Sequence, residues 1–285
     1  MDPQTFMNIA TTVSKLKMWP YFDVCHYILM ALAVREDSPQ TGSQAFSRKH
    51  PLSCWVSTML MCFGGSILAN LMLGEPCIVA FKRHDMVLTA TVVWYLINYS
   101  PMDICYKTMR LLPLRVVAFL AVEIRRAKQV HDGVAITAKL HPNAYLLMII
   151  IAVSRGGGAA FMRSFERMVR GVWIPTVNEI LLPTFTTKAC IAAALIFVLE
   201  RMNYLTAPHA VIHFGIVIFF IYFRLSSLLL GIHDPFLPFE NLFCAVFMGG
   251  MWDALRRVKE EVKENGTTKD SKQDVVKGKD EKKKD

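Results

Sequence analysis

Long apolar segments constrain what this chain can fold into more than any other feature of the sequence. The hydrocarbon core of a bilayer is about 30 Å thick, and a helix needs roughly 20 predominantly apolar residues to cross it. Segments that reach or approach this length are residues 18–34, 52–73, 86–105, 112–130, 144–161, 185–199 and 208–230. We therefore predict an all-α polytopic membrane protein with seven transmembrane helices.

The composition agrees with a membrane protein. Hydrophobic residues make up 53% of the 285 residues and charged residues 19%, whereas soluble domains carry about 25% charged residues. These values exclude a cytosolic enzyme, a secreted disulfide scaffold and a disordered regulator. The net charge is +9, and most of it lies in or beside the apolar segments, which indicates anionic lipid rather than nucleic acid as a partner.

Two features recur at a constant spacing and indicate an internal repeat. Lys49-His50-Pro51 precedes the second apolar segment, and Leu140-His141-Pro142 precedes the fifth, 91 residues later; Gly65 and Gly156 have the same separation. Three helices per repeat invert the second copy, so we predict two inverted three-helix repeats plus a seventh helix. The expected parts are an N-terminal lumenal segment (1–17), the repeats (18–106 and 107–202), the seventh helix (203–232), an interfacial and charged helical segment (233–265) and a disordered cytosolic tail (266–285).

Glycines occupy corresponding places in the two copies. Gly64 and Gly65 lie in the second segment, and Gly156, Gly157 and Gly158 lie in the fifth. Three consecutive glycines cost a helix about 1 kcal/mol each, which favours a break or kink at this point. Interrupted helices at matching positions are typical of binding sites near the membrane midplane. The alternative is that the glycines only allow close helix packing.

Charged residues inside the apolar segments are candidates for a polar path, because a charge at the bilayer centre costs at least about 2.5–3.5 kcal/mol. Outside the fourth segment these candidates include Asp23, Arg155, Lys188 and Arg224. For Asp23, Lys188 and His213, snorkelling or a single interhelical hydrogen bond explains the residue equally well.

The fourth segment carries the densest charge, with Glu123, Arg125, Arg126 and Lys128. Glu123 and Arg126 are three residues apart and share a helix face. One carboxylate cannot neutralise three cations, so we predict a nearby anion, either carboxylates of other helices or a phosphorylated lipid headgroup. Backbone N–H groups freed at Gly156–Gly158 would add donors for the phosphate.

Motifs of enzymatic chemistry are missing from the sequence. It contains no Gly-x-Ser-x-Gly, no His-Glu-x-x-His and no phosphate loop, so we predict that the protein is not an enzyme. His209 and His213 are one helical turn apart, as in a metal site, but the sequence offers no third ligand, and no metal is predicted. Seven cysteines show neither metal nor disulfide spacing, and no cleavable signal is expected at the N-terminus.

Basic residues of the short loops favour a cytosolic C-terminus. The last residues, Lys282-Lys283-Lys284-Asp285, place lysines third and fourth from the end, which is the pattern of a dilysine retrieval signal for the endoplasmic reticulum. A chance match in a lysine-rich tail explains this ending equally well.

Several motifs together resemble the trimeric intracellular cation channels over about residues 19–235. They are Pro20-Tyr21-Phe22-Asp23 with His26, Phe63-Gly64-Gly65, Arg155-Gly156-Gly157-Gly158-Ala159, Phe165-Glu166-Arg167, Gly171-x-Trp173-x-Pro175, Thr187-Lys188 and Arg224. The resemblance implies seven spans, an inverted repeat and a homotrimer of the endoplasmic or sarcoplasmic reticulum. Each protomer would hold a pore for monovalent cations such as potassium and bind phosphatidylinositol 4,5-bisphosphate, with functional coupling to calcium-release channels.

The resemblance also implies roles for the charged and glycine residues. Lipid contacts are expected at Arg125, Arg126, Lys128, Gly156, Gly157 and Gly158, and pore or gating roles at Asp23, Val122, Glu123, Arg155, Lys188 and Arg224. One departure matters: Val122 stands where the family has a lysine, and Gln129 occupies a further basic position. We hypothesise that Arg125 compensates for the missing lysine.

Three alternatives remain open. A secondary transporter uses the same inverted repeat, and a lipid-binding scaffold without conduction would account for Val122. A seven-span receptor is a weaker alternative, because the end of the third segment reads Asp103-Ile104-Cys105-Tyr106 rather than an Asp-Arg-Tyr-type sequence.

Overall fold

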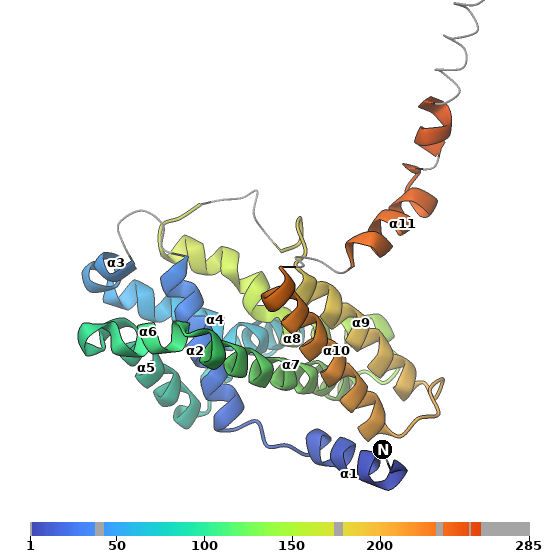
Figure 1. Ribbon diagram of the computed structural model, residues 1–285, viewed down its shortest axis with the longest axis horizontal. Helices are drawn as coiled ribbons and strands as arrows, with labels where there is room; N and C mark the ends of the chain where they lie inside the picture. The colour runs from blue at the N-terminus through green and yellow to red at the C-terminus, as the bar shows by residue number, and fades with distance from the viewer. Residues whose placement is uncertain (1, 38–42, 174–178, 232–235, 251, 258–285) are drawn as a thin grey trace, which may run out of the picture. The chain divides into compact units, whose positions relative to one another are not determined.

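The computed structural model describes residues 2–37, 43–173, 179–231, 236–250 and 252–257, and within these residues it is helical without strands (Figure 1). This confirms the all-α prediction. The α-helices are α1 (Pro3–Ser14), α2 (Tyr21–Glu36), α3 (Ser43–Lys49), α4 (Pro51–Met72), α5 (His84–Tyr99), α6 (Ile104–Arg110), α7 (Leu112–Leu140), α8 (Tyr145–Val169), α9 (Phe185–Arg201), α10 (His209–Leu230) and α11 (Leu237–Phe247), with 3-10 helices η1 (Cys77–Phe81) and η2 (Pro101–Asp103).

Every predicted apolar segment contains a helix, and three helix ends differ from the predicted segments; one of them is that of α8, which continues past residue 161 to Val169. The third segment was expected to end at residue 105, but α5 ends at Tyr99. Pro101 restricts Ser100 to an extended conformation, and Met102 and Asp103 have φ of 52° and 58°, which turns the chain away. The fourth segment was expected to end at residue 130, whereas α7 continues to Leu140.

Three helices of the described residues are long and apolar enough to cross a membrane, namely α4, α8 and residues 209–229 of α10. Helices α2 and α5 have 16 residues and α9 has 17, so at 1.5 Å per residue they extend about 24–26 Å. Helix α7 is longer, with 29 residues, but several charges interrupt its apolar surface. The seven-span count and the inverted repeat therefore stay predictions.

Helix α8 continues without interruption through Gly156–Gly158, and α4 continues through Gly64 and Gly65. The predicted break is wrong. The two helices cross at these glycines, and a Cβ built on Gly65 would lie 2.4 Å from the carbonyl oxygen of Arg155. The absence of side chains permits this close approach, and the tertiary packing outweighs the low helix propensity of glycine.

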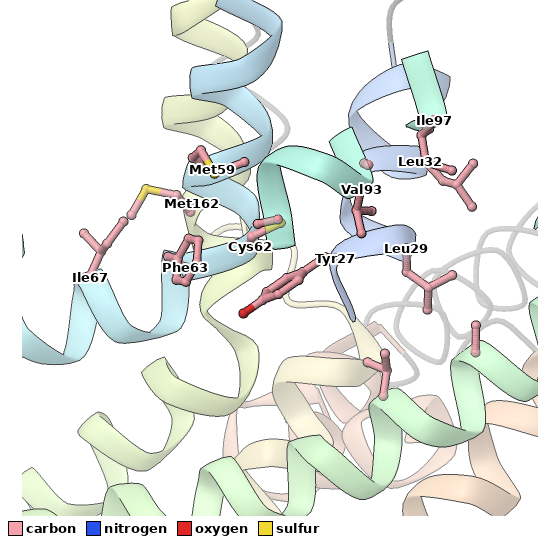
Figure 2. Packing of buried hydrophobic residues seen from close by; sticks show 14 residues of the cluster. Tyr27, Leu29, Leu32, Met59, Cys62, Phe63, Ile67, Val93, Ile97 and Met162 are labelled. Atoms are coloured by element: carbon pink, nitrogen blue, oxygen red, sulfur yellow. The ribbon is translucent and has the colours of Figure 1, made fainter. Parts of the chain in front are cut away.

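A hydrophobic core joins α2, α4 and α5 and includes Met162 of α8 (Figure 2). The ring of Tyr27 on α2 lies 5.7 Å from the ring of Phe63 on α4, measured between centroids. Val93 and Ile97 of α5 are buried in the same cluster. Because each buried side chain of this size contributes about 1.5–3 kcal/mol, this core holds α2 firmly beside α4.

Ion pairs connect the C-terminal end of α2 to the C-terminal end of α8. Asp37 accepts two hydrogen bonds of 3.0 Å from Arg167 and one of 2.7 Å from Arg170, which also pairs with the buried Glu166. Burial alone would raise the pKa of Asp37, but the hydrogen bonds from both guanidinium groups outweigh it and hold the pKa below its usual value. Arg167 and Arg170 therefore tie the end of α8 to the end of α2.

Residues 1–17 were expected to be an N-terminal lumenal segment; most of them form α1, which packs on α10, and the lumenal side stays a prediction. Phe6 and Phe214 meet edge to face with ring centroids 5.6 Å apart, and Ala10 is fully buried.

The chain divides into two compact units, Met1–Asp234 and Pro235–Asp285. In the second unit, α11 and residues 252–257 are helical. The interfacial role expected for this segment stays a prediction, and the tail expected to be disordered lies outside the described residues.

Candidate functional site: an arginine-lined cavity

A cavity of about 320 Å³ lies among α2, α4, α7, α8, α9 and α10. This volume is at the lower end of the range typical of small-ligand pockets. The charged residues that line it are Arg125, Arg126, Arg155, Arg163, Arg224 and Glu179. Guanidinium groups from three helices thus face a common space inside the bundle.

Helix α7 contributes its side chains to the cavity through ordinary helical spacing. Val122, Arg125, Arg126 and Gln129 follow one another at i, i+3, i+4 and i+7, and all four line the cavity. Positions with this spacing share one helix face. Lys128 lies off this face and is not among the lining residues; its Nζ is 3.6 Å from Asp132 Oδ1. Of the basic residues expected to bind lipid, Arg125 and Arg126 therefore meet and Lys128 points elsewhere.

Arg125 pairs with Asp23 across the α2–α7 contact. The distance from Arg125 Nε to Asp23 Oδ1 is 2.6 Å, and the two side chains are 16% and 3% exposed. Asp23 is buried and therefore does not snorkel, whereas its one hydrogen bond from Arg125 of α7 agrees with the alternative of a single interhelical hydrogen bond.

Glu123 is buried between two arginines. Arg126 Nη1 donates to Glu123 Oε2, and Arg224 Nε of α10 lies 3.8 Å from Glu123 Oε1. The guanidinium group of Arg224 also rests 4.0 Å from the ring centroid of Phe119, an attractive cation–π contact. Glu123 thus holds α10 to α7 at the cavity wall.

The glycines of α8 shape the cavity wall without providing free backbone donors. Arg126 Nε donates to the carbonyl oxygen of Gly156 at 3.3 Å. The N–H groups of Gly156–Gly158 belong to an intact helix, so their expected role as freed phosphate donors is wrong. Gly156 and Gly157 line the cavity, whereas Gly158 packs on Gly65.

The remaining predicted pore residues separate into two groups. Val122 is buried and lines the cavity, as does Arg155, whose Nε lies 3.4 Å from Gln129 Oε1. Lys188 lies in the first turn of α9 and is not among the lining residues.

The sequence did not indicate Arg163 or Glu179 as members of the site; His26, an ionisable residue that the sequence places in the first apolar segment, also lines the cavity. Arg163 follows Arg155 by two steps of four residues, so helical spacing in α8 could have indicated it. Glu179 was not detectable, because it reaches the site from a segment before α9, where its Oε1 accepts hydrogen bonds of 2.7 Å from Thr184 N and 2.5 Å from Thr187 Oγ1.

The cavity has an excess of positive charge. Five arginines face it, and the carboxylates within the site are those of Asp23, Glu123 and Glu179. Planar guanidinium groups bind phosphate and carboxylate oxygens through paired hydrogen bonds. The arrangement can therefore hold an anionic group and position it inside the bundle.

Comparisons with known proteins agree on one family. Residues 40–231 match the sequence model of a family described as TRIC channel. The trimeric intracellular cation channel type 1B.1 of Caenorhabditis elegans is 49% identical over 258 residues, which cover 90% of this chain and 87% of that protein. The type B channel of Danio rerio is 36% identical over 81% of this chain and 80% of its own length.

Solved structures give the same result. The structure of a trimeric intracellular cation channel from C. elegans in the absence of Ca²⁺ superposes with a TM-score of 0.76 at 43% identity, covering 82% of this chain and 100% of that one. A structure described as the basis for activity of TRIC counter-ion channels in calcium release gives a TM-score of 0.74 at 30% identity, covering 79% of this chain and 99% of that one.

Proposed function

Because this chain belongs to the TRIC channel family, we propose that it forms a homotrimeric channel for monovalent cations, potassium above all, in the membrane of the endoplasmic or sarcoplasmic reticulum. The observation that carries the proposal is the charged cavity inside the helix bundle, whose arginines pair with buried carboxylates. A polar cavity within an apolar bundle is expensive unless it serves a permeating or bound species.

The proposed role is to carry counter-charge while calcium leaves or enters a store. Moving one charge against 100 mV costs about 2.3 kcal/mol, so calcium flux stalls unless another ion compensates. The relatives described as counter-ion channels in calcium release support this role, and it implies functional coupling to calcium-release channels. We propose a cytosolic C-terminus, which the basic residues of the short loops favour.

A cation path lined by arginines needs neutralising groups. Asp23 and Glu123 neutralise Arg125 and Arg126 from within the bundle. For the remaining excess we propose an anionic lipid headgroup, phosphatidylinositol 4,5-bisphosphate, held by Arg126 and the neighbouring arginines of the cavity. Occupancy by this lipid would regulate the channel by changing the field along the path.

The experiment is a planar-bilayer recording of the purified full chain in potassium and in calcium solutions, with and without the phosphoinositide. We expect discrete single-channel steps in potassium, little calcium current, and an open probability that changes with the lipid. Saturable transport without single-channel steps would contradict the channel and support the secondary transporter.

A second candidate function, a non-conducting lipid-binding scaffold, is favoured by one observation. Val122 is buried in the cavity wall, at the position where the resemblance implies a lysine. If the wild type binds phosphoinositide without any current, and Val122→Lys restores a current, the scaffold replaces the channel as the function. A current from the wild type rejects the scaffold.

A further inference from the structure

A carboxylate faces the arginine cavity directly. Of the described residues that line the cavity, five are arginines and one, Glu179, is acidic. Asp23 and Glu123 do not line it: their side chains are 3% exposed, and each pairs with an arginine of α7. Glu179 is therefore the acidic group that an ion inside the cavity meets.

Hydrogen bonds fix this carboxylate at the start of α9. Its Oε1 accepts from Thr184 N at 2.7 Å, from Thr184 Oγ1 at 2.6 Å and from Thr187 Oγ1 at 2.5 Å. A helix N-terminus favours a negative charge, and hydrogen bonds to an ionised carboxylate are strong. In the described part of the chain these bonds engage Oε1, which leaves Oε2 open to an ion.

The carboxylate lies where the cavity reaches the surface of the bundle. Glu179 is half-buried, Thr184 is exposed and Thr187 is buried. Thr184, Thr186 and Ser227 also line the cavity, so hydroxyl groups surround Glu179 in this part of the wall. Oxygen atoms replace water around alkali cations in channel filters. This part of the wall therefore suits a cation, in contrast to the arginine-lined part.

The arginines alone would favour anions in the cavity. Rings of arginine or lysine are typical of anion pores, and rings of aspartate or glutamate are typical of cation pores. Asp23 and Glu123 neutralise only part of the positive charge. A fixed carboxylate at the entrance raises the local concentration of cations, because the apolar walls of a cleft focus its field.

We propose, on the basis of the proposed channel function, that Glu179 determines the charge selectivity of the cavity. Its carboxylate draws cations into a passage whose other charged residues favour anions. Thr184 and Thr187 are positioning residues, because they hold the carboxylate at the entrance.

The test is the reversal potential of the purified full chain in a planar bilayer with a KCl gradient, which gives the permeability ratio of K⁺ to Cl⁻. Glu179→Gln keeps the size of the side chain and an acceptor oxygen but removes the charge. We expect it to lower the ratio at least about fivefold, the factor for one unit charge at about 4 Å in bulk water. Glu179→Asp, which keeps the charge, should stay cation-selective. The matched control is Glu200→Gln, which removes an acid from the other end of α9, outside the cavity lining, and should behave like the wild type.

Glu179→Cys tests the charge at this position even where Glu179→Gln conducts poorly. Modification of the new thiol with a negatively charged methanethiosulfonate should restore cation selectivity, and a positively charged reagent should lower the ratio further. Cys77 and Cys244 are exposed, so the wild type treated with each reagent is the control.

The outcomes separate this proposal from the channel function. A cation-selective wild type with an unchanged ratio in Glu179→Gln would overturn the role of Glu179 and leave the channel in place. An equal loss in Glu200→Gln, or a selectivity of Glu179→Cys that is independent of the charge of the reagent, would do the same. A wild type without single-channel steps would contradict the channel itself and, with it, the role of Glu179.

Discussion

Gly158 of α8 packs against Gly65 of α4 so closely that a Cβ built on Gly158 would lie 2.2 Å from the Gly65 Cα. A Cβ atom this close to another heavy atom, under 3.0 Å, requires the neighbouring atoms to move. The neighbour here is a backbone atom of Gly65, which cannot move away by a side-chain rotation. The crossing of α4 and α8 therefore depends on glycine at this position. Because both helices also line the arginine cavity, the crossing fixes the shape of that cavity.

Gly158→Ala should destabilise the protein by at least about 1–3 kcal/mol, the usual cost of inserting atoms into a packed core. Gly157→Ala is the matched control in the same turn of α8. Its Cβ would meet Thr187 Oγ1 at 3.5 Å, an ordinary contact, and alanine is the better helix former by about 1 kcal/mol. Thermal unfolding in detergent measures both variants; equal stability of the two would contradict the packing argument.

Breaking the pair between Asp23 and Arg125 should cost about 3–5 kcal/mol, because either single change leaves a buried charge without a partner. We expect Asp23→Asn and Arg125→Gln each to lower the unfolding temperature, and the double variant to be less destabilised than the sum of the two. Unfolding of all four proteins completes the double-mutant cycle. Strict additivity would show that the two side chains do not interact.

Arg125→Ala also tests the compensation hypothesis. If Arg125 replaces the family's lysine, this change lowers phosphoinositide affinity and alters the open probability in a bilayer recording. Unchanged lipid affinity together with unchanged open probability would reject compensation.

Arg126→Ala should weaken phosphoinositide binding and alter gating, because it removes a cavity cation and leaves Glu123 with one less partner. Lys128→Ala is the matched control, since this lysine lies on the same helix but outside the cavity lining. Binding to vesicles with and without the lipid measures the difference. An equal loss of affinity in both variants would mean that the lipid binds outside the cavity.

The tie between Asp37 and the end of α8 predicts a pH dependence of stability. Because the pKa of Asp37 is lower in the folded protein than in the unfolded chain, where it is about 3.9, the carboxylate stabilises the fold above that value. This contribution is lost as the pH falls through the lower, folded pKa. The stability difference between the wild type and Asp37→Asn should therefore be constant from pH 7 to 5 and shrink below about pH 4.

Unfolding temperatures of the two proteins across this range provide the measurement. Asp85→Asn is a control, because it breaks the exposed pair with Arg83 and should change stability little. A difference between the wild type and Asp37→Asn that already changes between pH 7 and 5 would contradict this assignment.

The lengths of the apolar segments predicted the helices well. In an apolar environment the backbone N–H and C=O groups need hydrogen-bond partners, and a helix provides these partners within the segment itself. The charged face of α7 was also predictable, since Glu123 and Arg126 follow helical spacing. Helix propensity alone did not predict that α8 continues through Gly156–Gly158. Glycine lowers the local stability of the helix, but close packing against α4 outweighs this cost. Only the tertiary structure brings Gly65 to the α8 glycines.

Contacts between distant segments account for the other misses. Glu179 lies five residues before Thr184, from whose backbone N–H and hydroxyl it accepts hydrogen bonds, and only the tertiary structure brings this segment to the cavity. The separation of Lys128 from Arg126 was within reach, because a residue two positions later falls on a different side of the helix; its separation from Arg125, three positions earlier, was not.

If α7 crosses the membrane, as the proposed seven-span channel requires, its length has a consequence for the surrounding bilayer. Its 29 residues extend about 44 Å at 1.5 Å per residue, which exceeds the roughly 30 Å of hydrocarbon by several turns. At the usual tilt of about 20°, close to two turns project into the headgroup layer. In the proposed channel, a thinner or thicker bilayer would then change the tilt of α7 and shift Arg125 and Arg126 against α2 and α8, so membrane thickness would act mechanically on the proposed ion path.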